Sequence, residues 1–392
     1  MRPLDGIKVI ALEQAVAAPF CSRQLADLGA RVIKIERPGV GDFARDYDQA
    51  VKGLSAYFVW LNRSKESLTL DVKHPQAAEI MAKLIAGADV FLQNLAPGAA
   101  RRLGLDAETL LARHPRLIVA DISGYGDSGP YAHKKAYDLL VQSEAGVLSV
   151  TGTPEQQCKV GISIVDIAAG MYAYSGILTA LYQRERTGKG TRVEVTMFEA
   201  LGEWMSNPLL YTHFSGKPLR RSGPDHATIV PYGRFKCGGG SSVMMGIQNE
   251  REWVKFCAEV LGDAKLAQDK RYDNNAKRLE RRAEVVELIE RVFGAFSAEQ
   301  VMAKLDAAGI ANARVNTAEE LWEHAQLKAR DRWRKVGSAA GPIEVLLPPV
   351  TMPGFEARMD AIPAIGEHTE RILAELGYSA ADIGGLRQSS AV

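Results

Sequence analysis

The chain has 392 residues, of which 46% are hydrophobic and 24% charged, and its formal net charge is +1. This balance argues against a nucleic-acid-binding protein, which needs an excess of Lys and Arg, and against intrinsic disorder, which needs low hydrophobicity and high net charge. The length suggests two or three domains with cores of ordinary size.

Features of export, membrane insertion and metal binding are lacking in the sequence. The N-terminal residues do not have the pattern of a signal peptide, and the longest apolar stretch, Ile167 to Tyr182, is shorter than the roughly 20 residues of a membrane span. The four cysteines form no CxxC pair, and no HExxH occurs among the histidines. We therefore expect a cytoplasmic protein with reduced thiols, no membrane contact and no metal site.

The first half of the chain alternates short apolar runs with helical patterns. Helical spacing is found at 19–28, at 75–85 and after residue 166. This β-α-β-α rhythm predicts an α/β domain with a mostly parallel sheet covered by helices. The predicted strands are 7–12, 31–36, 67–72, 89–92, 117–122 and 192–195.

The composition changes after about residue 200. Proline and glycine gather in residues 201–228, which we expect to be a linker. Two β-rich runs then flank Cys237-Gly238-Gly239-Gly240-Ser241, a pattern typical of a hairpin, and a charged helical region follows. We predict a large-domain part at 1–200, a small α+β domain at 229–328, and a return linker and C-terminal part at 329–392 with a final helix near 367–376.

One apparent nucleotide motif follows the fifth predicted strand. Residues 124–129 read Gly-Tyr-Gly-Asp-Ser-Gly, which matches GxGxxG. Pro130 comes next, however, and no helix with apolar periodicity begins there, so a pyrophosphate would lack a helix N-terminus. We interpret this segment as a glycine loop at the carboxyl end of a strand, where ligands bind in open α/β sheets.

Asp166 stands between an apolar run and a long apolar helix. Aspartate is favoured as a helix N-cap, because its carboxylate accepts backbone N–H bonds. A carboxylate at a helix start beside small residues is also both fixed and accessible, so it is a candidate covalent nucleophile. The two roles are compatible, and the residues alone leave both open.

Several segments in one order resemble the class III CoA-transferases of the CaiB/BaiF type, which include formyl-CoA transferase and carnitine CoA-transferase. They include ADLGARVIKIERPGVGD, LNRSKESLTLDVKHP, ISGYGDSGPY, YDLLVQSEAG and GISIVDIAAGMYAYSGILTAL. The resemblance implies that Asp166 attacks an acyl-CoA thioester to give an anhydride and then an aspartyl-CoA thioester. It also implies a CoA thioester as substrate, with no permanently bound cofactor.

The resemblance extends to positions that contact CoA. Arg37, Arg102 and Lys135 match basic residues, the expected partners of phosphates. Tyr137, Asp138 and Met197 match positions around the nucleophile. The implied CoA-binding set is Gln14, Ala15, Val16, Ala17, Arg37, Leu70, Asp71, Val72, Lys73, Asn94, Leu95, Arg102, Lys135, Tyr137, Asp138 and Met197.

The substrates are inferred from similarity to transferases that act on small dicarboxylates. Succinyl-CoA is the expected donor, and itaconate, mesaconate, malate and citramalate are expected acceptors. A second carboxylate needs a cation in the acyl pocket, for which Arg45 and Arg63 are the candidates. Formyl-CoA transferase has glutamine where Val16 stands, which argues against oxalate and formate as the natural pair.

Other functions remain open at this stage. An α-methylacyl-CoA racemase shares the architecture, but it uses a His-Asp pair where this chain has Tyr137-Asp138, and tyrosine is a poor base near neutral pH. Transfer to a monocarboxylate or a carnitine-like acid is a further alternative, as is non-catalytic CoA binding. The family's architecture implies an interlocked homodimer whose large doubly wound, Rossmann-like domain uses both chain ends.

Overall fold

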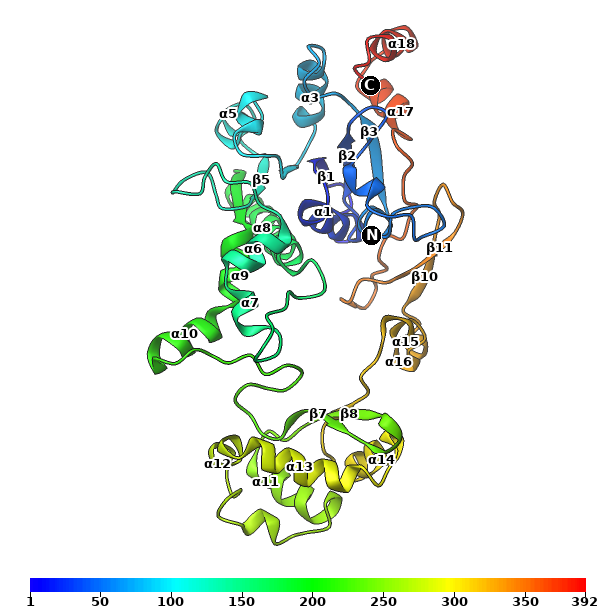
Figure 1. The fold of residues 1–392 in the computed structure, drawn as a ribbon. Coiled ribbons are helices and arrows are strands. Elements are labelled where there is room, and N and C mark those ends of the chain that lie inside the picture. Colours follow the sequence, from blue (N-terminus) through cyan, green and yellow to red (C-terminus); the bar gives the residue numbers. More distant parts are fainter. The chain divides into compact units, whose positions relative to one another are not determined.

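Six short strands form one parallel sheet in the computed structural model, which describes residues 1–392 (Figure 1). Their order is β3-β2-β1-β4-β5-β6, and every neighbouring pair is parallel. This is the strand order of a doubly wound sheet, so the predicted fold class is confirmed. The strands are β1 (Lys8–Leu12), β2 (Arg31–Glu36), β3 (Lys65–Thr69), β4 (Val90–Gln93), β5 (Ile118–Ser123) and β6 (Thr191–Thr196).

Helices cover both faces of the sheet, which explains why the central strands are apolar at consecutive positions. Val9, Ile10 and Ala11 of β1 are all fully buried. One core cluster packs strand residues against helices from both ends of the chain. The helices around the sheet are α1 (Ala17–Asp27), α2 (Ala56–Leu61), α3 (Ala77–Ala86), α4 (Ala99–Arg102), α5 (Ala107–Arg113), α6 (Asp138–Glu144), α8 (Ile164–Thr187), α9 (Met197–Trp204), α17 (Thr369–Glu375) and α18 (Ala380–Gln388).

The chain divides into two units. The first contains residues 1–146, 160–207 and 327–392, and the second contains residues 147–159 and 208–326. The segment 147–159, with the short helix α7 (Val147–Val150), thus groups with the second unit, although it lies within the 1–200 range assigned to the large domain from sequence. Helix α10 (Ser206–Ser215) begins at the boundary, and β10 (Trp333–Val336) pairs with β11 (Ile343–Leu346) in the first unit.

The second unit is built around the predicted hairpin. Strands β7 (Tyr232–Lys236) and β8 (Ser242–Gly246) are antiparallel around a glycine turn at Gly238–Gly240, and β9 (Asn312–Ala313) pairs with β8. Arg278 is buried in its core beneath Trp253 and is ion-paired with Glu250. The helices here are α11 (Glu250–Lys255), α12 (Asn275–Glu280), α13 (Arg282–Phe293), α14 (Ala298–Ala307) and α15 (Ala318–Trp322), and α16 (Ala325–Ala329) ends just beyond it.

Three predicted elements differ from those observed. The stretch 201–228, expected to be a linker, contains the end of α9 and the whole of α10. The strand predicted at 67–72 is β3 at Lys65–Thr69, because Asp71 leaves the sheet and donates its N–H to the carbonyl of Ala391. The single final helix is a pair, α17 and α18. The second helix begins with a reciprocal cap between Ser379 and Asp382, a Ser-x-x-Asp signal that the sequence analysis missed.

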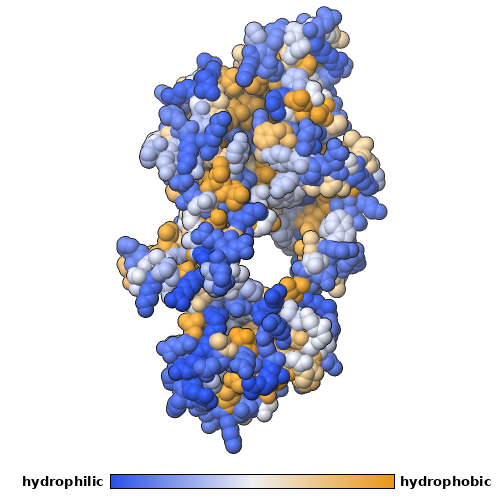
Figure 2. All heavy atoms as spheres, in the orientation of Figure 1, coloured by the Kyte–Doolittle hydropathy of each residue, from blue (hydrophilic) through white to orange (hydrophobic).

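Helix α8 is the one helix long and apolar enough to cross a membrane, judged by length and composition only. It packs against α1, β5, β6 and α9, as a core helix does. Figure 2 shows hydrophilic residues over most of the visible face, with apolar residues confined to patches.

Candidate active site

The strand order reverses between β1 and β4, and this is where doubly wound sheets bind ligands. Gln14 follows β1 and Asn94 follows β4. The Asn94 side chain accepts a hydrogen bond from the Gln14 N–H at 2.9 Å and donates one to the Gln14 carbonyl at 2.9 Å. These two bonds fix the loop after β1 to the end of β4, so the structure brings together two residues that the sequence analysis placed in the CoA site.

The loop then turns sharply into α1. Ala15 has a φ of +61°, a left-handed conformation that is unfavourable for alanine. No side chain caps α1, and the N–H groups of Val16, Ala17 and Ala18 make no hydrogen bond. Unpaired N–H groups at a helix start attract negative charge, so this turn provides donors for an oxyanion or a phosphate.

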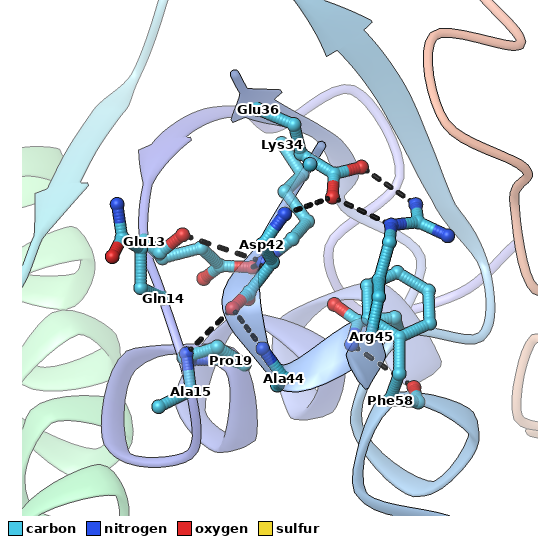
Figure 3. Close-up of polar contacts among 12 residues, drawn as sticks. Glu13, Gln14, Ala15, Pro19, Lys34, Glu36, Asp42, Ala44, Arg45 and Phe58 are labelled. Atoms are coloured by element: carbon cyan, nitrogen blue, oxygen red, sulfur yellow. Dashed lines mark hydrogen bonds and ion pairs between the residues drawn. The ribbon is translucent and has the colours of Figure 1, made fainter. Parts of the chain in front are cut away.

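A buried ionic cluster lies beside this loop, and Figure 3 labels three of its members, Glu13, Lys34 and Asp42. Asp42 contacts Lys34 at 2.8 Å, and Glu13 contacts Lys65 at 2.7 Å and Lys34 at 3.4 Å. All four side chains are completely buried. Burial alone raises the pKa of Glu13, but Lys65 and Lys34 together hold it below its usual value. The cluster is therefore charge-balanced, with two cations facing two anions.

Asp166 lies in the first turn of α8. It is the third residue of the helix and not its cap, so the N-cap interpretation is wrong. Asp138 of α6 takes that place: its Oδ1 accepts the N–H of Val165 at 2.8 Å and the N–H of Asp166 at 3.4 Å. Because this carboxylate satisfies the first N–H groups, α8 begins at Ile164 without a cap of its own.

Asp138 is itself held by a buried amide. Gln142, completely buried, donates to Asp138 Oδ2 at 2.7 Å and accepts the N–H of Val160 at 2.9 Å. The two side chains thus anchor the segment leading into Asp166 to α6. Sequence reasoning missed Gln142, since nothing in its local pattern distinguishes it from any other polar residue in a helix.

The Asp166 carboxylate is half-buried and has no hydrogen-bond partner. Burial, with a smaller contribution from the Asp138 charge, raises the pKa of Asp166 from 3.8 to about 7. A carboxylate that its surroundings leave unsolvated and unpaired is a more reactive nucleophile than one held by a salt bridge.

Close packing of α8 on α1 places Asp166 beside the turn after β1. A Cβ atom on Gly170 would lie 2.6 Å from the Ala17 carbonyl oxygen and 3.0 Å from Phe20. Asp166 is one helical turn before Gly170, so both lie on the face of α8 that meets the start of α1. Asp166 and the unpaired N–H groups of α1 therefore lie at the same helix contact.

Tyr47, which sequence reasoning also missed, lies near Asp42 and Asp166. Burial, with the nearby charges of Asp42 and Asp166, raises the pKa of Tyr47 to about 12. Its ring meets Tyr57 edge-on, with centroids 5.5 Å apart. Tyr137, which precedes α6, is largely exposed, whereas the predicted site residue Met197 is buried at the start of α9.

Three other predicted CoA contacts line one cleft. Val72, Lys73 and Arg102 line a cleft of about 830 Å³ between α3 and the α4 region. Asp71 accepts the N–H of Lys73, which shapes this turn. Leu70 is instead buried in the core. Arg37 and Lys135 are exposed, and Leu95 lines a separate hollow of about 580 Å³ at the ends of β4 and β5.

The two arginines expected in the acyl pocket are both held by internal carboxylates. Arg63 forms two hydrogen bonds with Asp27, at 2.8 and 2.7 Å, and only 3% of it is exposed. Arg45 forms a similar pair with Glu36 and stacks on Phe58. Both guanidinium groups already donate a pair of N–H groups to a carboxylate of the chain. Either arginine would therefore have to break its ion pair before it could bind a substrate carboxylate in this way.

Comparison with known proteins fits this geometry. The sequence model of CoA-transferase family III matches residues 4–369. A succinyl-CoA:glutarate CoA-transferase of Mus musculus is 32% identical, with 96% of this chain and 87% of that protein covered. A succinyl-CoA–D-citramalate CoA-transferase of Chloroflexus aurantiacus is 31% identical over 96% of this chain and 94% of that protein. A CaiB/BaiF family crystal structure from Brucella suis has a TM-score of 0.84 at 32% identity, covering 96% and 99% of the two chains.

Proposed function

The chain belongs to CoA-transferase family III, and we propose that it moves CoA from succinyl-CoA to a small dicarboxylic acid through a covalent intermediate on Asp166. The observation that supports this most directly is the Asp166 carboxylate itself. It is half-buried, has no hydrogen-bond partner, and lies where α8 meets the N–H groups at the start of α1.

The reaction proceeds by four acyl transfers. The Asp166 carboxylate attacks the donor thioester carbonyl, the C–S bond breaks, and CoA leaves as a thiolate. The thiolate attacks the Asp166 carbonyl carbon, which releases the donor acid and forms an aspartyl-CoA thioester. The acceptor carboxylate displaces the thiolate to give a second anhydride, and the thiolate then takes the acceptor acyl group and frees Asp166. Together, these four steps replace the direct transfer of CoA between two acids, which is slow, with a series of easier covalent steps.

The start of α1 supplies the electrostatic part of this mechanism. Each attack places negative charge on a carbonyl oxygen, and the N–H groups of Val16, Ala17 and Ala18 have no partner in the protein. Donors that are fixed before the reaction stabilise such an oxyanion without a reorganisation cost. The exposed cations Arg37, Arg102 and Lys135 suit the phosphates of CoA.

Dicarboxylates are the proposed acceptors because the names of two relatives specify glutarate and D-citramalate. Itaconate, mesaconate, malate and citramalate remain our candidates from sequence, and glutarate joins them. Arg45 stays a candidate for binding the second carboxylate, in exchange for part of its pairing with Glu36. Arg63 is the weaker candidate, because it is almost completely buried.

The decisive experiment incubates the purified protein with succinyl-CoA and a panel of acids: glutarate, itaconate, mesaconate, malate, citramalate, oxalate, acetate and carnitine. New acyl-CoA is read by mass spectrometry, beside the Asp166→Ala and Asp166→Asn variants. We expect exchange with one or more dicarboxylates and a loss of about 10³-fold or more in both variants. Exchange that persists in both variants would exclude the covalent role of Asp166.

The same assay separates the alternatives. Exchange only with acetate, oxalate or carnitine would replace the dicarboxylate assignment with another acceptor class. No exchange with any acid, together with deuterium uptake at the α-carbon of a branched acyl-CoA, would support proton transfer of the racemase kind instead.

A further inference from the structure

Asp42 joins two loops that approach the proposed site. Its Oδ1 accepts the N–H of Ala15 at 3.1 Å and the N–H of Ala44 at 2.9 Å (Figure 3). Ala15 belongs to the turn after β1, and Ala44 belongs to the short helix Phe43–Asp46 that precedes Tyr47. One carboxylate oxygen therefore joins the turn after β1 to the short helix that leads into Tyr47.

The other oxygen of Asp42 fixes the carboxylate in place. Oδ2 contacts Lys34 Nζ at 2.8 Å, and Lys34 extends from β2, the strand between β1 and β3. The Asp42 N–H donates in turn to Glu36 at 2.9 Å. Only 2% of Asp42 is exposed, so neither water nor substrate reaches it. The residue has no access to a reacting atom, and any role in the reaction must be exerted through the backbone it holds.

The backbone it holds is strained. Ala15 has a φ of +61°, which an L-residue with a Cβ adopts only at a cost. The next three N–H groups, of Val16, Ala17 and Ala18, are the unpaired donors at the start of α1. The direction of these N–H groups depends on the turn at Ala15. The Ala15 N–H donates to the side chain of Asp42, which follows β2, and this hydrogen bond holds the turn in place.

We propose that Asp42 is a positioning residue for the acyl-CoA thioester, which holds Ala15 in its left-handed conformation and thereby aims the N–H groups of Val16–Ala18 at the thioester oxygen. This inference rests on the proposed function, since it assigns those N–H groups to the thioester. Without Asp42, the turn relaxes toward an ordinary conformation and the donors point elsewhere.

The test is a double-mutant cycle between Asp42→Ala and Ala15→Gly. Glycine adopts a positive φ freely, so Ala15→Gly removes the strain that Asp42 offsets. We expect Asp42→Ala to lower kcat/KM for succinyl-CoA by about 10- to 100-fold, a typical cost of misplacing reacting groups. In the Ala15→Gly background the same substitution should cost at least about fivefold less.

Asp89→Ala is the matched control. Asp89 also accepts a backbone N–H, that of Lys8 at 2.9 Å, and also pairs with a buried arginine, Arg184 at 2.9 Å. It does so at the amino ends of β1 and β4, whereas Ala15 follows the carboxyl end of β1. We expect Asp89→Ala to lower thermal stability but to keep kcat/KM within about twofold at a temperature where the protein is folded. Asp42→Ala with an equally small effect on kcat/KM would overturn the proposal.

Calorimetric binding of succinyl-CoA by the Asp166→Ala variant keeps this test separate from the proposed function. Asp42→Ala in that background should weaken binding, and Ala15→Gly should restore part of it. A wild-type protein that exchanges no acid would overturn the proposed function, while the binding cycle would still decide the role of Asp42. If Asp42→Ala weakened binding equally with and without the Ala15→Gly substitution, the role of Asp42 would be overturned whatever the reaction is.

Discussion

At the scale of the residue, Asp166 combines partial burial with the absence of any compensating cation. Its carboxylate accepts no hydrogen bond, and the charged group that acts on its pKa, Asp138, has the same sign. The native state therefore keeps the proton on Asp166 at pH values where an unfolded chain has lost it. The ionised form of Asp166 therefore lowers the stability of the native state, a cost that is common at functional sites.

This has a measurable consequence for folding. The pKa of Asp166 is raised from 3.8 to about 7, so its ionisation destabilises the native state progressively between about pH 4 and pH 7. Asp166→Asn removes that ionisation. We expect the variant to gain roughly 2–4 kcal/mol in free energy of unfolding relative to wild type between pH 4 and pH 8, measured by urea denaturation. A difference that does not change with pH would contradict the raised pKa.

The same pKa governs activity. The proposed nucleophile, Asp166, must be ionised to attack the thioester, so kcat/KM for succinyl-CoA should fall below about pH 7. Burial is the larger cause of the raised pKa and the Asp138 charge the smaller, so Asp138→Asn should move this acidic limb to lower pH without bringing it to 3.8. Glu144→Gln, on the same helix but paired with Lys134, should leave the limb in place. A limb unmoved in Asp138→Asn would show that the two carboxylates are not coupled.

At the scale of the element, the site depends on how closely two helices approach. Helices α1 and α8 touch through Gly170, where a side chain would meet the Ala17 carbonyl oxygen at 2.6 Å. Asp166 is one turn away on the same face of α8. Any widening of this contact moves Asp166, the proposed nucleophile, away from the N–H groups of α1, so the packing of the two helices affects the proposed chemistry.

Gly170→Ala tests that link. We expect a loss of about 1–3 kcal/mol in the free energy of unfolding from overpacking, together with a lower kcat/KM under conditions where the protein is folded. The control is Gly202→Ala in α9, whose added Cβ has no atom within 4 Å, and which should gain about 0.5–1 kcal/mol from helix propensity. Full activity in Gly170→Ala would contradict this link, because it would show that α1 and α8 can move apart without affecting the reaction.

At the scale of the whole molecule, we propose a homodimer, as the resemblance implied. The exposed apolar residues of α10 support this, since Leu209, Leu210 and Phe214 are 57%, 58% and 79% exposed in the single chain. Exposed apolar side chains gathered on one helix are typical of a surface that another protein covers.

Light scattering after size-exclusion chromatography measures this directly. The expected mass is twice the 42.6 kDa of the chain. Leu210→Glu should reduce the dimer fraction at low concentration, because it would bury a charge in the contact. A wild-type mass of one chain at all concentrations would reject the homodimer.

The sequence by itself determined the strands of the large domain, except the bounds of β3, and the family. Local runs of Val, Ile and Leu fix strands such as β1 and β2, because backbone preference and burial act on neighbouring residues. The lack of a helical pattern after Gly129 argued against a dinucleotide site, and the next helix along the chain is α6, which begins at Asp138. The order of the matching segments identified the family, and with it Asp166 as the candidate nucleophile.

Only the tertiary structure decided which side chains meet. Asp138 caps the helix of Asp166 from 28 residues away, and Asp42 reaches Ala15 across 27. Arg63, which we expected to bind substrate, is instead hydrogen-bonded to Asp27, 36 residues earlier in the chain. Such partners are chosen by the packing of distant elements, and pKa values follow from the burial and charges that this packing creates, so neither can be read from local sequence.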